Sequence, residues 1–299
     1  MDQLASDLRN GNTCSSMIAP YESRNQTKEV WAYNLIEEAF KICGLVKKYR
    51  YVAMDTEFPG KPLYPTNIGD PNFAIQNATE NVNMTKLIQV GITLMDENGE
   101  MPEDTQSWEF NLEFDVNKDF YASDAIEILQ SSGLDFQKHK TQGIKHFNFA
   151  EIFYQIGLAC NPGVTWIGFS IAFDFCHLLK VVKGEDKLHY EKMEEFKEDV
   201  KWFFPNVFDV KEVGPKFGFW GGLEAMATKI EIRRQGNQHR AGSDSRLTGQ
   251  VFFKIVQENT RGLDDRRLME KKGEITGFEE DRLKRSVAWN AAQDNREQD

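Results

Sequence analysis

Residues 49–58 read YRYVAMDTEF, and this stretch decides the fold. Its centre, Tyr51–Met54, is a continuous apolar run of the kind that forms a buried strand. Asp55 and Glu57 follow at a spacing of two, which places both side chains on one face of a strand. Burying two carboxylates is costly unless a cation neutralises them. The stretch therefore indicates a buried strand that ends in a metal-binding pair, although in a chain with 47 acidic residues such a pair also arises by chance.

Two more strands are predicted downstream. Residues 86–95 read KLIQVGITLM, a second apolar run, and residues 107–114 read SWEFNLEF, in which apolar and polar side chains alternate. Residues 96–99 read DENG, which is typical of a turn. Together with the first strand, these segments predict an antiparallel meander.

Helices and strands alternate in the rest of the chain. Helical spacing runs from Glu29 to Leu45 before the first strand. After the meander, helices are expected near 123–130, 145–156, from Asp174, near Leu223 and over 245–257, with strands at 164–170 and 206–210. This order predicts an α/β fold of the ribonuclease H-like kind: a mixed sheet, with the meander followed by parallel strands, helices on both faces and a single domain over residues 28–260.

Three segments fall outside these elements. Residues 1–27 are rich in Asn, Ser, Gln and Asp without periodicity, which predicts a flexible arm. Residues 59–83 hold much of the Pro, Gly and Asn and predict a long loop, a feature that is often functional. Glu, Lys, Arg and Asp dominate residues 261–299, which predicts a charged tail, helical or disordered.

The composition limits the classes of protein. The net charge of −11 and pI of about 5.1 confine any nucleic-acid binding to a local cleft, where bound metal ions would reverse the sign of the charge. The four cysteines form no CxxC pair, which favours a reducing compartment. No signal peptide or membrane-spanning run is found, so no membrane partner is expected. The expected location is the cytoplasm, with the nucleus left open.

Three further residues could take part in chemistry. Asp174 follows the strand at 164–170, Asp244 opens the helix at 245–257, and His239 lies five residues before Asp244. Each has an ordinary alternative, because Asp is a common N-cap and a lone His is more often structural or exposed. Gly242 permits the turn that would bring His239 and Asp244 together.

The ordered set D-x-E, D and H-x-x-x-x-D is far more specific than its parts. Four carboxylates can hold two divalent cations about 3.5–4 Å apart. The cations Mg²⁺ and Mn²⁺ suit oxygen ligands. One ion would lower the pKa of a bound water and the other would stabilise a leaving 3′-oxygen. The predicted base is His239, because an imidazole titrates near neutral pH. The predicted metal ligands are Asp55, Glu57, Asp174 and Asp244.

This arrangement resembles the DEDDh pattern of ribonuclease H-like exonucleases. The flanking sequence is similar to the Caf/Pop deadenylase subunit of the CCR–NOT complex, over about residues 29–257. The motifs that carry the likeness are MDTEFPG (54–60), NVNMTKLIQVG (81–91), WEFNL (108–112), FFPNVFDVK (203–211), GGL (221–223) and QHRAGSDSRLTG (238–249).

The resemblance implies a 3′–5′ exoribonuclease that shortens the poly(A) tail of mRNA and releases AMP. It assigns metal ligation to the four carboxylates and the role of general base to His239. It also implies docking on the large NOT scaffold subunit and, as an open possibility, on a CCR-type deadenylase. Two features depart from the family: Lys61-Pro62 stands where Arg-Pro is usual, and residues 63–80 lack the usual Tyr- and Arg-containing pattern.

The expected RNA contacts are less specific. Phe58 could stack on a base, but a core position is equally plausible. Lys86 and Arg240 could meet phosphate, although most surface cations bind nothing specific. Asp209 could support the site from behind, but a strand-end or turn role is favoured.

Two other functions compete with the deadenylase. One is a DEDDh exonuclease that acts on other single-stranded nucleic acid, because the motif itself does not read adenine. The other is a catalytically minor nuclease fold that links partners of the complex. A degenerate nuclease would be expected to lose a ligand, and here all five residues are present.

Overall fold

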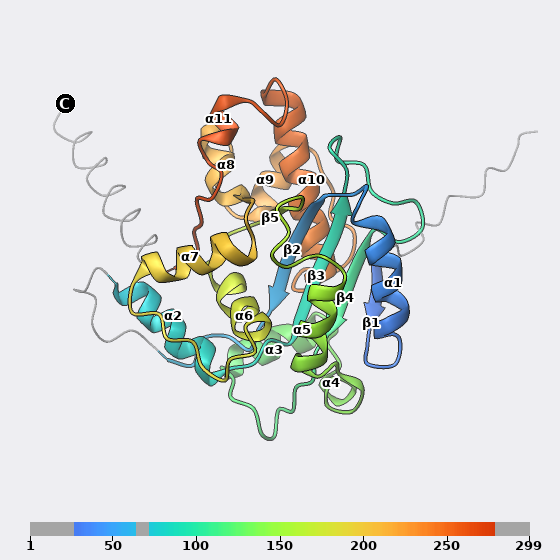
Figure 1. Ribbon diagram of the computed structural model, residues 1–299, viewed down its shortest axis with the longest axis vertical. Helices are drawn as coiled ribbons and strands as arrows, with labels where there is room; N and C mark the ends of the chain where they lie inside the picture. Colours follow the sequence, from blue (N-terminus) through green and yellow to red (C-terminus); the bar gives the residue numbers. More distant parts are fainter. Residues whose placement is uncertain (1–26, 64–71, 279–299) are drawn as a thin grey trace, which may run out of the picture.

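The computed structural model describes residues 27–63 and 72–278, and these build one six-stranded mixed sheet (Figure 1). The strand order is β1-β4-β3-β2-β5-β6. β2–β3 and β3–β4 are antiparallel, whereas β1–β4, β2–β5 and β5–β6 are parallel. The predicted meander and the parallel strands after it are therefore confirmed. The strands are β1 (Thr27–Val30), β2 (Tyr51–Glu57), β3 (Gln89–Met95), β4 (Ser107–Asn111), β5 (Thr165–Gly168) and β6 (Val207–Asp209).

Helices cover both faces of the sheet, as predicted (Figure 1). The larger apolar core lies between one face and α1, α2, α5, α6 and α7, and a second core lies between the other face and α8, α9, α10 and α11. None of the described helices is both long and apolar enough to cross a membrane. The helices are α1 (Leu35–Leu45), α2 (Phe73–Met84), α3 (Ser123–Ser131), α4 (Phe136–Gln142), α5 (His146–Gln155), α6 (Ala172–Val182), α7 (Met193–Phe203), α8 (Val210–Lys216), α9 (Leu223–Lys229), α10 (Ala241–Asn259) and α11 (Arg266–Met269).

The alternation of side chains along β2 decides which face carries chemistry. Val52 and Met54 belong to the larger core, and Ala53 belongs to the core beneath α10. Because side chains two apart share a face, Asp55 and Glu57 lie on the same side as Ala53. The two carboxylates therefore extend the α10 face beyond the point where its apolar packing ends.

The long helix α10 approaches the sheet closely at a glycine. It packs against β2, β3 and β4. A Cβ atom placed on Gly91 of β3 would lie 2.0 Å from the carbonyl carbon and oxygen of Ala241, the first residue of α10. Only glycine fits between the strand and the helix N-terminus here. One turn into the helix, the hydroxyls of Thr93 and Ser245 form a hydrogen bond of 2.9 Å.

Two elements differ from the sequence predictions. The helix expected from Glu29 begins only at Leu35, because residues 27–30 form the edge strand β1 beside β4. The long loop predicted over 59–83 is wrong from residue 73 onward, where α2 lies. The buried apolar residues of α2 recur at helical spacing: Ala74, Ile75, Ala78 and Val82. The Asn and Thr residues between them obscured this pattern in the sequence.

The packed domain extends further than predicted. The boundary at 260 is wrong, because Leu268 of α11 and Phe278 are buried in the two cores. Few apolar residues in this charged segment suffice to hold it in place. Thr27, counted in the expected arm, begins β1. The remainder of that arm, residues 1–26, and residues 279–299 of the expected tail lie outside the described residues.

The close approach at Gly91 is testable. Gly91→Ala should lower the free energy of unfolding by about 3 kcal/mol, because the added methyl overpacks the contact with α10. Gly44→Ala is the matched control: Gly44 lies on α1, where an added Cβ has no neighbour within 4 Å, and should stabilise by up to about 1 kcal/mol. Urea unfolding of both variants measures the difference. Equal effects at the two sites would contradict the close approach.

Candidate active site

Three carboxylates converge at the end of β2. Oxygens of Asp55, Glu57 and Asp244 lie within 4.8 Å of one another, with Asp55 half-buried and the other two buried. The strand supplies the first two, and the first turn of α10 supplies Asp244. The structure thus brings together residues that lie almost 190 positions apart in the sequence.

Asp174 approaches these carboxylates from the opposite face of the sheet, close enough for its charge to act on Asp55 and Glu57, but it is not one of the three residues whose oxygens converge within 4.8 Å. It lies in the first turn of α6, whose N-cap is Ile171, so the alternative role as an N-cap is excluded. Its Oδ1 accepts hydrogen bonds from the Thr56 amide (2.9 Å) and the Thr56 hydroxyl (2.7 Å). Thr56 is the residue between Asp55 and Glu57, so these two bonds hold Asp174 against the end of the strand that carries both.

The carboxylates repel one another in a poorly solvated place. Burial, followed by the charges of Asp244 and Asp174, holds the pKa of Asp55 and that of Glu57 well above their usual range. Burial also raises the pKa of Asp174 to about 6, against the lowering effect of its hydrogen bonds to Thr56. Burial raises the pKa of Asp244 as well, opposed by the nearby Arg234. The protein alone does not supply enough positive charge to ionise the whole set at its ordinary pKa.

Arg234 is the cation that the sequence reasoning missed. Its Nη1 lies 2.7 Å from Asp244 Oδ1 and donates to Ser243 Oγ at 3.1 Å, while its Nε contacts the Glu224 carboxylate. The guanidinium therefore balances part of the charge on a predicted metal ligand. No motif around residue 234 marks this role; only its place five residues before His239 in the sequence hints at proximity.

Hydrogen bonds from the sheet hold the start of α10. Gln89 Oε1 accepts from the Ala241 amide (2.8 Å), and Glu109 Oε1 accepts from the Gly242 amide (3.1 Å). Carboxylate and amide oxygens suit a helix N-terminus because its first amides lack partners within the helix. These contacts set the position of the turn that carries Asp244.

Arg240 is engaged within the protein. The guanidinium that was expected to meet phosphate pairs with Glu109 and, at 3.0 Å, with Glu29 of β1, and it donates to the Gly133 carbonyl at 3.1 Å. These contacts tie the edge strand to the N-terminus of α10. The geometry therefore favours a structural role for Arg240 over contact with substrate.

His239 lies in the turn that leads into α10. Its side chain is exposed, and its backbone has a φ of 60°, in the left-handed region that non-glycine residues adopt uncommonly. Its charge is close enough to Asp244 to influence that carboxyl. The structure therefore places an exposed imidazole near Asp244, and its role as the base stays a prediction.

The other two expected substrate contacts lie in different places: Phe58 directly follows Glu57, and Lys86 lies in the segment before β3. Phe58 is half-buried and stacks on His177, with 4.6 Å between ring centroids, and on Phe173 at 6.0 Å. Lys86 has a half-exposed side chain that pairs with Asp119 at 2.7 Å. Phe58 is thus partly a packing residue and partly available at the edge of the site.

Asp209 connects three segments of the chain. This fully buried residue at the end of β6 accepts hydrogen bonds from the amides of Ser170 (2.8 Å), Lys211 (2.9 Å) and Thr276 (2.9 Å). Ser170 belongs to the turn that leads into α6 and Asp174. These contacts confirm the favoured strand-end and turn role. One of them holds the turn before Asp174, and support of the site stays a prediction.

The donor set fits a hard divalent cation. All candidate ligand atoms are carboxylate oxygens, which Mg²⁺ and Mn²⁺ prefer over nitrogen or sulfur. Their raised pKa values show that positive charge between them would be strongly favoured. A metal ion at Asp244 would replace the positive charge that Arg234 supplies to this carboxylate.

The raised pKa values predict how stability depends on pH. In the metal-free folded protein, burial raises the pKa of Asp174 to about 6, whereas in the unfolded chain this carboxyl loses its proton near its ordinary value of about 4. Stability from this group is therefore present below about pH 4 and is lost as pH rises through 6, on the order of 3 kcal/mol. The melting temperature in EDTA should fall between about pH 4.5 and 7. Added Mg²⁺ should remove most of that fall, and Asp174→Asn should reduce it, because Asp55 and Glu57, whose pKa values are also raised, contribute the rest. A melting temperature that rises over this range would contradict the assignment.

The contacts of Asp209 predict a second effect. Asp209→Ala leaves buried amides without an acceptor and should cost about 3 kcal/mol or more of stability. It should also weaken the stabilisation by Mg²⁺, because the turn before α6 is released. Asp265→Ala is the control, since Asp265 also accepts backbone amides but caps the short helix α11, and should cost about 1 kcal/mol. Calorimetry with and without Mg²⁺ separates the two, and an undiminished Mg²⁺ effect in Asp209→Ala would refute the link to α6.

Comparison with known proteins identifies the family. The model of the CAF1 family ribonuclease matches residues 30–155. The chain is 37% identical over 258 residues to the poly(A) ribonuclease pop2 of Schizosaccharomyces pombe, covering 85% of this chain and 75% of that protein. The structure of S. pombe Pop2p in its Mg²⁺- and Mn²⁺-bound form matches with a TM-score of 0.79 and 35% identity, over 85% of this chain and 100% of that one. A structure of the yeast NOT1 MIF4G domain co-crystallised with CAF1 matches with a TM-score of 0.71 and 26% identity, over 83% of this chain and 96% of that one. This chain belongs to the CAF1 family of ribonucleases.

Proposed function

We propose that the protein is a 3′–5′ exoribonuclease that shortens mRNA poly(A) tails and releases AMP. The observation that carries this proposal is the convergence of oxygens from Asp55, Glu57 and Asp244 within 4.8 Å. Supporting evidence is the 37% identity to a poly(A) ribonuclease and the structural match to a form with Mg²⁺ and Mn²⁺ bound.

Two divalent ions, Mg²⁺ or Mn²⁺, would be held by the four carboxylates Asp55, Glu57, Asp174 and Asp244. When bound, the ions supply an activated water and stabilise negative charge on the leaving 3′-oxygen. Asp55 and Glu57 come from a rigid central strand, and Thr56 between them orients Asp174. The protein thus holds its ligands in place before the substrate arrives.

His239 accepts the proton of the attacking water in this proposal. Its exposed position lets it exchange that proton with solvent after each turnover. Arg234 pairs with Asp244 and opposes the effect of burial, which raises the pKa of that carboxyl in the metal-free protein. At the edge of the site, Phe58 presents an aromatic face to a base and Lys86 presents a cation to phosphate.

The partners proposed for this chain follow from its relatives. A yeast CAF1 was co-crystallised with the MIF4G domain of NOT1, and we propose that this chain docks on a scaffold subunit of the same kind. Contact with a CCR-type deadenylase remains an expectation from the sequence resemblance. A purely linking role is disfavoured, because the carboxylates form a metal-binding geometry rather than scattered surface groups.

The test uses a 5′-labelled RNA with an oligo(A) 3′ end, beside RNAs with other 3′ tails. Wild type should produce a ladder that shortens from the 3′ end with Mg²⁺ or Mn²⁺ and not with EDTA. Asp55→Asn and Asp244→Asn should abolish it, whereas Asp124→Asn, at an exposed position on α3, should not. His239→Ala should slow hydrolysis by about 10²–10⁴-fold while Mn²⁺ binding persists.

Each part of the proposal can fail separately. Full activity in Asp55→Asn would remove the metal assignment. Equal trimming of all tails would leave an exonuclease without adenine preference. Loss of Mn²⁺ binding in His239→Ala would make His239 a ligand rather than the base. No trimming with any metal would favour the linking role.

A further inference from the structure

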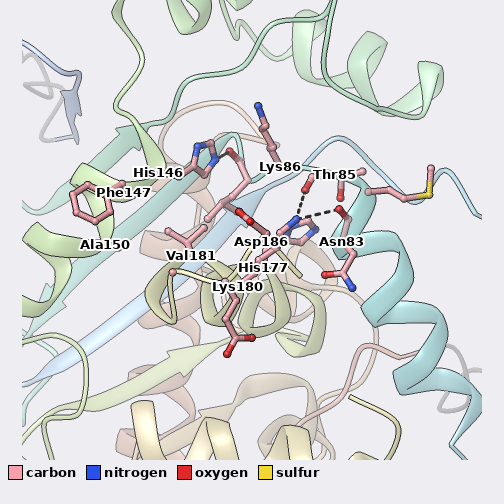
Figure 2. Close-up of a pocket in the computed structure, with 14 residues that line it drawn as sticks. Asn83, Thr85, Lys86, His146, Phe147, Ala150, His177, Lys180, Val181 and Asp186 are labelled. Carbon is pink, nitrogen blue, oxygen red and sulfur yellow. Dashed lines mark hydrogen bonds between the residues drawn. The ribbon is translucent and has the colours of Figure 1, made fainter. Parts of the chain in front are cut away.

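A cavity of about 530 Å³ lies between the elements that pack on the α6 side of the sheet (Figure 2). It is bounded by the end of α2, the segment Thr85–Leu87 that leads into β3, the start of α5 and one side of α6. Its volume falls in the range of small-molecule sites, about 300–1,000 Å³. Leu87, Ala150 and Val181 contribute apolar walls.

One aromatic ring separates this cavity from the metal ligands. Phe58 directly follows Glu57 and stacks on His177, which lines the cavity. His177 lies one helical turn beyond Asp174 on α6. The Ile88 amide donates to the Glu57 carbonyl at 2.9 Å, which fixes the cavity wall at Leu87 against the end of β2. The cavity is therefore connected to the end of β2 by two contacts, the ring stack of Phe58 on His177 and the backbone hydrogen bond from Ile88 to Glu57.

His177 is a buried polar group that faces this space (Figure 2). Its side chain belongs to a residue only 2% exposed. Among the residues that the structure describes, its contact is the stacked Phe58, and no hydrogen bond to its ring nitrogens is formed. Burial lowers its pKa to about 3, so the ring is neutral and offers one N–H donor and one acceptor. A buried group of this kind is normally hydrogen-bonded, and the cavity is the place from which a ligand can supply the partner.

His146 supplies a second polar edge. Its Nε2 lies 2.8 Å from the Leu87 carbonyl, which can only accept, so Nε2 carries the proton. Burial lowers the pKa of His146, which favours the neutral ring and leaves Nδ1 as an acceptor. Lys180 is not available, because its ammonium donates to the carbonyls of Val82, Asn83 and Thr85 (Figure 2).

The charges around the mouth distinguish a base from a phosphate. Lys86 places a half-exposed ammonium at one edge, whereas Glu185 and Asp186 place carboxylates at another. The interior holds two neutral imidazoles between apolar walls. A flat, neutral heterocycle with both donors and acceptors suits the interior, and the attached phosphate suits the edge near Lys86.

We propose that this cavity binds one adenine base of the RNA strand close to the scissile phosphate. The purine packs between Leu87, Ala150 and Val181, and its exocyclic amino group donates to an acceptor such as His146. A ring nitrogen of the base accepts from His177. This inference rests on the proposed nuclease function and deepens it, because it gives the site a way to read adenine that the metal ligands lack.

The test fills the cavity from two walls. Ala150→Trp closes it from α5 and Val181→Phe from α6, and Glu151→Trp adds the same indole to the exposed side of α5 as a control. Each variant is assayed with oligo(A) RNA and with bis(p-nitrophenyl) phosphate, a diester without a base. Binding of RNAs with one abasic position among the last nucleotides is measured in an Asp55→Asn background.

Both filled variants should raise KM for oligo(A) about tenfold, which corresponds to about 1.4 kcal/mol. Hydrolysis of the small diester should stay unchanged. In the Asp55→Asn background with an open cavity, affinity should fall about tenfold when one particular base is removed, and with the cavity filled it should not. The preference for oligo(A) over oligo(U) should shrink in the same two variants.

An unchanged KM in both filled variants overturns the proposal. An equal rise in KM in the control Glu151→Trp overturns it as well. So does an Asp55→Asn protein with an open cavity whose RNA affinity is the same for every abasic position. Because the two variants act from different helices, misfolding of one leaves the other as the test. Failure of the wild type to hydrolyse either substrate with metal would instead refute the nuclease function, and the binding measurements would still report on the cavity.

Discussion

The structure depends on holding four carboxylates close together where water is scarce. Burial of like charges is strongly unfavourable unless positive charge or hydrogen bonds compensate. The protein meets part of this cost with Arg234 at Asp244 and with the two hydrogen bonds from Thr56 to Asp174. The remainder appears as raised pKa values, which a divalent cation would relieve. The repulsion between these carboxylates is what a bound divalent cation would relieve.

The sheet is shaped to serve this requirement. Beneath α10, its surface changes from apolar packing to polar contacts towards the site: Gln89 and Glu109 meet the helix amides, and Gly91 lets the backbone approach. A purely apolar interface would tolerate sliding of the helix, whereas hydrogen bonds to particular amides do not. On the other face, Asp209 fixes the turn before α6 in a similar way. Both helices that deliver a carboxylate are therefore held at their first turns.

Sequence patterns predicted the parts of this protein that repeat a simple period. The apolar runs predicted the central strands, and the spacing of Asp55 and Glu57 at a strand end predicted that both carboxylates lie on one face, where Asp244 joins them. The edge strand β1 was missed because only four residues pair there, too few for a period to emerge. Arg234 and the packed segment 261–278 were missed because their roles come from tertiary contacts within charged sequence. Single anchors such as Phe278 leave no periodic signal.

The contact between Asp209 and the amide of Thr276 has a consequence for biosynthesis. Chains are made from the N-terminus, and domains fold as their segments become available. β2 and its two acidic residues are synthesised well before α10 and the segment that reaches Phe278. Until those segments emerge, one face of the sheet lacks the helix that covers it, and Asp209, which holds the turn before α6, lacks its contact with Thr276. A growing chain that has not reached α10 therefore exposes apolar surface and lacks Asp244, so its carboxylate cluster is incomplete.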